Sequence, residues 1–78
     1  MININEFVDQ FKDQYFDASE FEMDASTEFR KIESWDSLTG MAILVMIKDN
    51  FNIDFPEDKF RECITVQEVY EKVTKMIK

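Results

Sequence analysis

Residues 36–56 read DSLTGMAILVMIKDNFNIDFP, and this stretch decides what kind of fold the chain can adopt. Its first two thirds contain one Gly and no Pro, so a single helix can run through them. Pro56 disfavours helical backbone at the residue before it, and the helix must therefore end a few residues earlier. The stretch predicts a helix that begins at Asp36 and continues to about Asn50 or Phe51, with Ser34 or Asp36 as its N-cap.

A second helix is predicted ahead of this stretch, over roughly residues 3–16. Apolar side chains recur there at the spacing of one helix face, with polar residues between them. These apolar residues are Ile4, Phe7, Val8, Phe11 and Tyr15. Asn3 or Asn5 is the expected cap, because a side-chain oxygen at that position accepts a backbone N–H of the first turn.

Two further helices are predicted after Pro56. Pro56 followed by Glu57 and Asp58 is typical of a helix start and predicts a short helix over about residues 57–62, with Pro at its first position. Thr65 then caps a last helix, and Glu68 completes a capping box with it. The inner stripe of this last helix is expected to hold Val66, Val69, Tyr70, Val73, Met76 and Ile77.

Residues 17–35 show no sustained period and form a long connection. Spaced apolar residues predict that the connection packs onto the core: Phe21, Met23, Phe29, Ile32 and Trp35. Its end near Trp35 either only covers the bundle or also presents a site. We therefore expect an all-α fold, a small four-helix bundle of three main helices and one short helix with a long loop between helices one and two. Residues 1–78 are expected to form a single domain.

The composition excludes several classes of function. The chain has 78 residues with 17 acids, nine bases and no His, and its net charge is −8. This charge disfavours nucleic acid and anionic membrane surfaces as partners. Without His, neither a Ser-His-Asp nor a Cys-His nucleophilic site can form, and the single Cys63 cannot supply the ligands of a zinc site. An enzyme is therefore the least expected class.

The sequence also indicates where the protein is located in the cell. No apolar run is long enough to span a membrane, and the N-terminus shows no signal peptide. A lone cysteine forms no internal disulfide, which suits a reducing compartment, and we expect a cytoplasmic protein.

The charge is distributed unevenly along the chain. Residues 1–36 hold ten acids and three bases, net −7, whereas residues 37–78 hold seven acids and six bases, net −1. The acidic excess therefore lies outside the central helix.

The central helix carries two apolar stripes, although a bundle helix needs only one. The first stripe is expected to face the core and holds Gly40, Ile43, Leu44, Ile47 and Phe51. The second holds Leu38, Met41 and Val45, on the same arc as Ser37. Either the long loop buries this second stripe, or the stripe is an exposed contact surface beside Ser37.

Ser37 places a hydroxyl group in the first turn of the central helix. Backbone N–H groups and the helix dipole make the local field positive there, so a phosphate ester on this oxygen would be stabilised. A plain capping serine is the simpler interpretation and, on these grounds alone, the commoner one.

The residues around Ser37 resemble the attachment motif of acyl carrier proteins and related carrier domains. The motif is Asp36-Ser37-Leu38, preceded by Trp35 and followed by Thr39-Gly40-Met41. Phe29 lies where this family often has an aromatic residue, and FNIDFP at residues 51–56 and ITVQE at residues 64–68 resemble its later segments. The resemblance covers roughly residues 4–77, with the length and helix order of the family.

This resemblance implies a non-catalytic carrier. In the family, a phosphopantetheinyl transferase moves 4′-phosphopantetheine from coenzyme A onto the motif serine, here Ser37, and the motif acid, here Asp36, helps the transferase engage. The thiol of the arm then holds an acyl or aminoacyl group as a thioester. Leu38, Met41 and Val45 are the expected docking residues for acyl- or aminoacyl-activating and acyl-transferring enzymes. The carrier is expected to be a monomer without a metal site.

The resemblance also suggests where cargo would be sheltered and which pathway is served. The expected core and acyl-cavity walls are Phe7, Phe11, Ile43, Leu44, Ile47, Val69 and Val73. Carriers of fatty-acid synthesis usually present a run of acids on helix two, whereas here Asp49 is the only acid of that helix after Ser37. Trp35 before the motif resembles specialised carriers. We interpret the chain as a carrier in fatty-acid, polyketide or other specialised biosynthesis. Within this range, the sequence favours a dedicated carrier of a small specialised pathway.

A second class of function stays open beside the carrier. A small helical adaptor could bind proteins through the second apolar stripe without any prosthetic group. A calcium loop at residues 49–54 fails, because the required Gly is absent and Arg61 stands where the bidentate Glu belongs.

Overall fold

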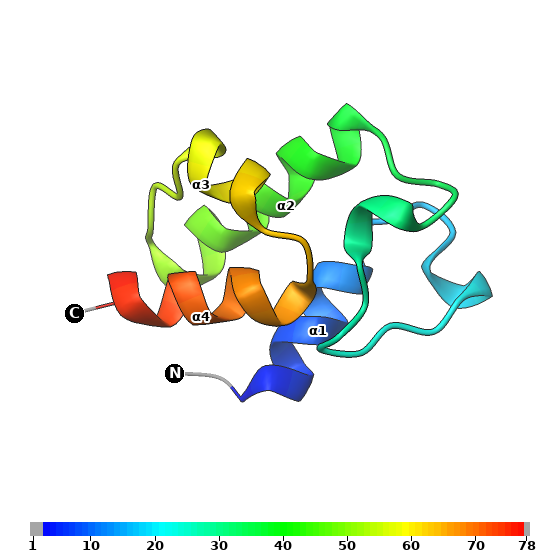
Figure 1. Ribbon diagram of the computed structural model, residues 1–78, viewed down its shortest axis with the longest axis horizontal. Coiled ribbons are helices and arrows are strands. Elements are labelled where there is room, and N and C mark those ends of the chain that lie inside the picture. Colours follow the sequence, from blue (N-terminus) through cyan, green and yellow to red (C-terminus); the bar gives the residue numbers. More distant parts are fainter. Residues whose placement is uncertain (1–2, 78) are drawn as a thin grey trace.

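Local sequence signals place the ends of the helices. In the computed structural model, which describes residues 3–77, four α-helices and two short 3₁₀-helices follow one another (Figure 1). The α-helices are α1 (Ile4–Lys12), α2 (Ser37–Phe51), α3 (Glu57–Glu62) and α4 (Val66–Met76). The 3₁₀-helices η1 (Ala18–Glu20) and η2 (Phe29–Lys31) lie in the long loop between α1 and α2. With no strand within these residues, the all-α bundle is confirmed.

Side-chain caps begin three of the four α-helices. Asn3 Oδ1 accepts the Glu6 N–H at 2.9 Å, so Asn3 rather than Asn5 caps α1. Asp36, not Ser34, caps α2, and Thr65 and Glu68 form the predicted capping box of α4. Pro56 is the N-cap of α3, with extended backbone, and not its first helical residue.

The first helix is shorter than predicted. It ends at Lys12 instead of near residue 16, and the chain then turns so that the Gln14 and Tyr15 N–H groups bond to the Phe11 and Lys12 carbonyls. The turn brings Tyr15 into the core, where its hydroxyl donates to the Phe29 carbonyl oxygen at 2.6 Å. A tertiary hydrogen bond has therefore replaced the last turn of the predicted helix.

The core is built mainly from the inner faces of the four helices and from loop residues. Its fully buried large side chains are Phe7, Phe11, Phe29, Ile43, Ile47, Val66, Val69 and Val73. Met76 and Ile77 are 38% and 37% exposed, so the predicted inner stripe of α4 was wrong at its end. These two residues extend past the packed part of the helix, where no neighbour covers them enough to exclude water.

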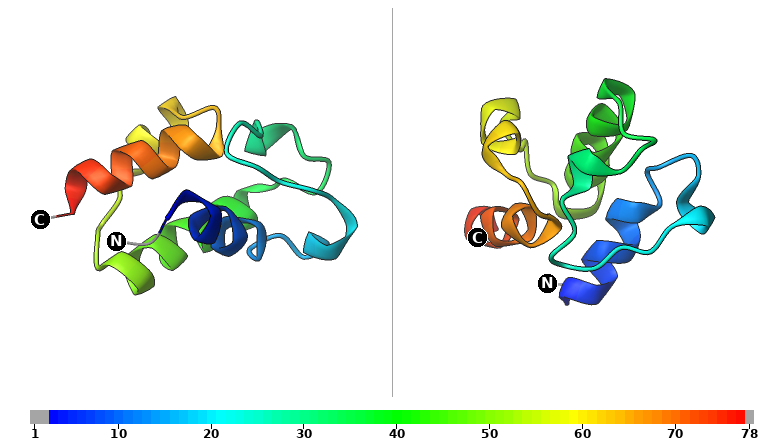
Figure 2. Two further views of the ribbon diagram at one scale, coloured as in Figure 1. Left: turned by 90° about the horizontal axis from the view of Figure 1, so that it is seen from below. Right: turned by 45° about the vertical axis from the view of Figure 1, so that its right-hand side comes forward.

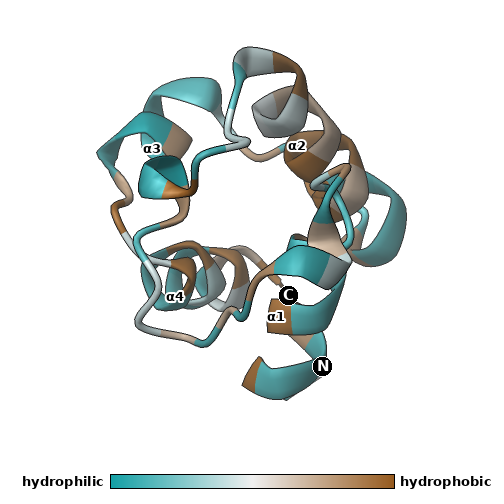
Figure 3. Cartoon of the chain, turned by 90° about the vertical axis from the view of Figure 1, so that its right-hand side faces the viewer, coloured by the Kyte–Doolittle hydropathy of each residue, from teal (hydrophilic) through white to brown (hydrophobic). Residues whose placement is uncertain are grey.

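The buried face of α2 is shifted around the helix relative to the predicted one. Gly40, Ile43 and Ile47 are buried as expected, and Thr39 and Met46 are buried too. Leu44 and Phe51 are only half-buried. Figure 3 shows α2 coloured as apolar along much of its length, whereas the other helices combine apolar and polar stretches. The sequence of α2 therefore did not reveal which of its apolar residues lie deepest.

The long loop is attached to the start of α4 by backbone contacts. Backbone N–H groups of Val66 and Gln67 bond to the Thr27 and Ala25 carbonyls, and Glu28 forms an isolated bridge with Thr65. The two views in Figure 2 show the loop passing beside the start of α4. The predicted packing of the loop onto the core is confirmed.

The Tyr15 hydroxyl gives a test of this attachment. Burial raises the pKa of Tyr15 above its ordinary value, so the unfolded chain loses this proton at a lower pH than the folded protein. Stability from this group is therefore present below about pH 10 and is lost as the pH rises further. We expect Tyr15→Phe to lower the free energy of unfolding by about 1–3 kcal/mol at neutral pH, since the Phe29 carbonyl loses its donor. In urea titrations, the stability difference between wild type and variant should shrink above pH 10, and a difference independent of pH would contradict the assignment.

Candidate functional site

Ser37 is the first residue of α2 and is exposed to solvent. Asp36 precedes it with extended backbone, and its carboxylate accepts the Thr39 N–H at 2.8 Å and the Thr39 hydroxyl at 3.0 Å. The Thr39 backbone N–H holds the pKa of Asp36 below its usual range. Asp36 therefore fixes the helix start, and the Ser37 hydroxyl is open to a reaction partner.

The second apolar stripe of α2 is exposed. Leu38, Met41 and Val45 are 75%, 62% and 57% exposed, so the long loop does not cover them. The three residues follow Ser37 along one side of the helix at spacings of three and four. Of the two interpretations of the sequence, the structure supports the exposed surface beside Ser37.

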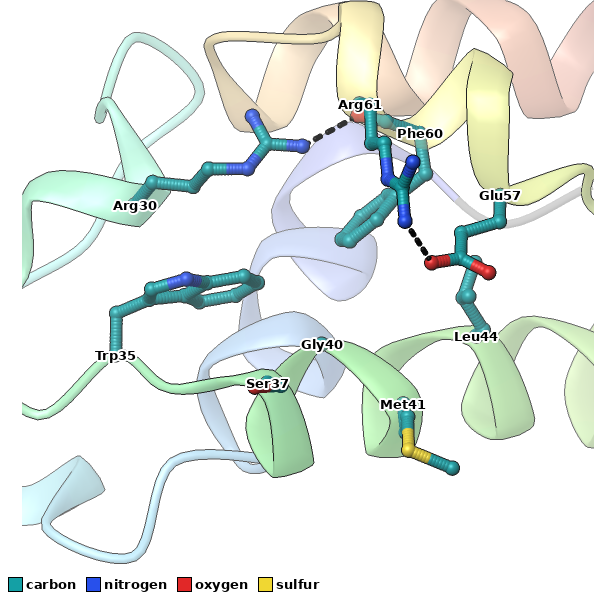
Figure 4. A pocket seen from close by; sticks show the side chains of 9 residues that line it. All are labelled: Arg30, Trp35, Ser37, Gly40, Met41, Leu44, Glu57, Phe60 and Arg61. Atoms are coloured by element: carbon teal, nitrogen blue, oxygen red, sulfur yellow. Dashed lines mark hydrogen bonds and ion pairs between the residues drawn. The ribbon is translucent and has the colours of Figure 1, made fainter.

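A pocket of about 390 Å³ lies next to Ser37, between the first half of α2 and α3. Its apolar lining comes from Trp35, Gly40, Met41, Leu44 and Phe60, and its polar lining from Arg30, Ser37, Glu57 and Arg61. Figure 4 shows the Trp35 indole and the Phe60 ring facing the start of α2, with Glu57 and Arg61 joined by an ion pair. We call this space the Ser37 pocket.

Trp35 sets one wall of the Ser37 pocket by packing on Gly40. A Cβ atom on Gly40 would lie 3.1 Å from Trp35 Cη2 and 3.2 Å from Trp35 Cζ2, and 3.6 Å from Phe60. The mid-helix glycine therefore makes room for an indole ring, and Trp35 occupies part of the space between α2 and α3.

Arg30 lines the pocket on the same side as Trp35, with its Cζ atom 5.8 Å from the centroid of the Trp35 ring (Figure 4). Its guanidinium group donates to the Phe60 and Cys63 carbonyl oxygens at the end of α3. It also lies over aromatic rings, with its Cζ atom 4.6 Å from the centroid of Phe29 and 5.2 Å from that of Phe60. Arg30 thus ties η2 in the long loop to the C-terminal end of α3 and contributes to the lining of the pocket.

The residues expected as core and acyl-cavity wall are mainly core residues. Of the seven residues predicted from the resemblance, only Leu44 lines the Ser37 pocket. The others are buried core residues: Phe7, Phe11, Ile43, Ile47, Val69 and Val73. Aromatic side chains fill the centre of the bundle; the ring centroids of Phe7 and Phe11, for example, are 6.1 Å apart. The open space lies toward α3 instead. Arg30 gave no signal in the sequence, whereas Phe60 was recognisable as the apolar residue of the short helix.

Cys63 lies at the end of α3 and takes no part in this pocket. Its side chain is fully buried, and burial raises the pKa of the thiol. A buried, protonated thiol is a poor nucleophile, so Cys63 is a packing residue.

Comparison with known proteins identifies the class to which this arrangement belongs. The family model described as phosphopantetheine attachment site matches residues 14–73. The chain therefore belongs to this family and is a carrier domain of the acyl carrier protein type, whose covalent cofactor is 4′-phosphopantetheine. Domains of this family are generally non-catalytic carriers. Comparisons with curated proteins and with solved structures gave no match.

No helix in residues 3–77 is long and apolar enough to cross a bilayer. Across the same residues, no group of three or more Asp, Glu, Cys or His side chains lies close enough to hold a metal ion.

The contact between Trp35 and Gly40 predicts a stability effect that depends on both residues. Ala is favoured over Gly in a helix by about 1 kcal/mol, but here the new methyl group would push against the indole. We expect Gly40→Ala to bring no gain in wild type and a gain of about 1 kcal/mol in a Trp35→Phe background. Urea unfolding followed by circular dichroism measures the free energy of unfolding of the wild type, the two single variants and the double variant. Equal gains in both backgrounds would show that Trp35 does not set this wall.

Proposed function

We propose that the protein is a carrier that holds acyl or aminoacyl intermediates as thioesters on a 4′-phosphopantetheine arm attached to Ser37. The observation that carries this proposal is an exposed serine hydroxyl at the first residue of α2, inside the region matched by the attachment-site family. The chemistry on the cargo belongs to partner enzymes, and the thiol comes from the arm. This agrees with a chain that has no His and whose one thiol is buried.

Asp36 has two roles in this proposal. As the cap of α2 it already accepts the Thr39 N–H, so a phosphodiester on Ser37 would point toward solvent and the arm could reach partners. Its carboxylate is also exposed, which leaves it open to the phosphopantetheinyl transferase during loading. The first role is structural and permanent, whereas the second is transient.

The Ser37 pocket is the proposed resting place of the arm or of a small cargo. Trp35, Leu44 and Phe60 supply an apolar surface for methylene groups, and Arg30, Glu57 and Arg61 lie in its lining to bond polar groups of a cargo. The pocket does not continue into the bundle centre, which is filled by aromatic side chains. This shape favours short or polar cargo over long alkyl chains and supports a specialised pathway.

Partner enzymes are proposed to dock on Leu38, Met41 and Val45. These side chains are exposed, apolar and next to the attachment residue, so a partner that covers them also has access to the arm. Asp49 is the only acid in α2, so docking through this surface should depend weakly on salt. The arrangement suits a monomer that meets its partners one at a time.

Loading with the cofactor tests the proposal directly. We expect coenzyme A and a broad-specificity phosphopantetheinyl transferase to add one phosphopantetheine mass to the wild type and none to Ser37→Ala. Ser34→Ala is the matched control, because Ser34 is a nearby serine that bonds to Asp17 and should load normally. Intact mass spectrometry measures the gain. A protein that does not load, or a Ser37→Ala variant that still does, would instead favour the adaptor without a prosthetic group.

Met41→Asp tests the docking surface. Because Met41 is mostly exposed, the variant should keep the helical circular dichroism signal and the thermal midpoint of the wild type. A charge in the centre of an apolar contact should lower kcat/KM for loading by the transferase about tenfold or more. Ile64→Asp is the control, since Ile64 is 55% exposed but lies between α3 and α4. Equal losses in both variants, or an unfolded Met41→Asp, would contradict the assignment.

A further inference from the structure

A basic pocket lies beyond the C-terminal end of α2 and shares α3 with the Ser37 pocket. Its volume is about 350 Å³, and its lining joins the segment after α2, the first half of α3 and the last turns of α4. The lining residues are Phe55, Pro56, Lys59, Lys72, Lys75 and Met76. Three of the nine bases of a chain with a net charge of −8 therefore gather around one hollow.

None of these lysines forms a salt bridge within residues 3–77, although the Thr65 N–H and, to a smaller extent, the charge of Lys72 lower the pKa of Glu68. The ion pairs found there are Lys31–Glu28, Lys48–Asp54 and Arg61–Glu57. Glu68, one turn before Lys72 on α4, is already engaged, because its Oε1 atom accepts the Ile64 and Thr65 N–H groups. The positive charge of the basic pocket is therefore available to an outside anion.

The floor of the basic pocket is apolar. Phe55 is largely buried, and Met76, which the sequence placed in the core, is exposed on the same side of α4 as Lys72. Lysine stems can cover such a surface while their ammonium groups stay in water. The combination suits a ligand with one apolar side chain between negative charges.

We propose that the basic pocket binds a short acidic segment of a partner protein, with an apolar side chain of that segment seated on Phe55 and Met76. The pocket adjoins the C-terminal end of α2, whereas Ser37 is at its N-terminal end. A helix of 15 residues is about 22 Å long, so a partner held at the basic pocket leaves Ser37 free, while Val45 of the docking surface lines a hollow together with Phe55 and Pro56. The site would tether the carrier while other enzymes service the arm.

Charge argues for this occupant over the alternatives. A second copy of the chain would bring another net charge of −8 and repel the first. An extended polyanion or an anionic bilayer would also meet the acids that dominate residues 1–36. A short acidic segment can contact the three lysines alone.

The experiment measures binding of a fluorescein-labelled peptide, Glu-Asp-Glu-Leu-Phe-Glu-Asp-Glu, to the full chain by fluorescence anisotropy. A peptide with Gln and Asn in place of the acids is the ligand control. We expect the acidic peptide to bind, and Lys72→Glu with Lys75→Glu to weaken binding about tenfold or more. Lys12→Glu with Lys31→Glu changes the net charge equally but outside the pocket, and should weaken it much less. Ser37→Ala should bind like the wild type, which separates this site from the carrier function.

Three outcomes would overturn the proposal. One is equal binding of the acidic and the neutral peptide, and another is an equal loss in the two charge-reversed variants. The third is binding of phosphatidylglycerol vesicles through Lys72 and Lys75 without binding of the peptide, which would make the partner a membrane. Amide shifts of the wild type give a readout that needs no variant, and they should change around Phe55, Lys59 and Met76 when the peptide is added.

Discussion

The burial of the Phe29 ring is the constraint on which the rest of the structure depends. This residue of the long loop is fully buried, with its ring centroid 5.1 Å from Phe11, 5.3 Å from Phe60 and 5.5 Å from Trp35. Its carbonyl also accepts the Tyr15 hydroxyl. Truncating a buried Phe typically lowers the free energy of unfolding by about 3–5 kcal/mol. This is a large part of the total free energy of unfolding of a domain, which is about 5–15 kcal/mol. A single loop side chain thus connects α1, α3 and the start of α2.

The site follows from this connection. Because Phe29 is fixed, the neighbouring Arg30 can reach the end of α3, and Trp35 can lie against Gly40. These two contacts leave an open pocket beside Ser37, while the aromatic core closes the centre of the bundle. The loop is therefore more than a cover for the helices, and its end near Trp35 forms part of the site. The proposed carrier function needs an exposed serine with a defined surface around it, and Ser37 is exposed beside this pocket.

Local rules predicted the helix starts and the class of fold, because caps such as Asn3, Asp36 and Thr65 act over a few residues. The motif around Ser37 likewise lies within one short segment. Features that depend on long-range contacts were missed. The end of α1 is set by Tyr15 bonding to Phe29, and the pocket is lined in part by Arg30, whose partners lie about thirty residues away. The apolar residues of α2 were predicted correctly as a group, but their depth depends on how the neighbouring helices are placed.

The two ends of α2 differ in charge and in the partners they suit. Its start offers a serine and an apolar surface, whereas its end adjoins a pocket rimmed by lysines. Attachment of the arm to Ser37 at the start of α2 can be tested by a phosphorus–proton correlation spectrum of the protein after loading with 4′-phosphopantetheine. We expect the phosphodiester phosphorus to couple to the β-protons of Ser37. We also expect changes in amide chemical shifts to be confined to the start of α2 and the residues around Trp35 and Phe60. Coupling to any other hydroxyl residue, or no phosphodiester signal at all, would contradict attachment to Ser37.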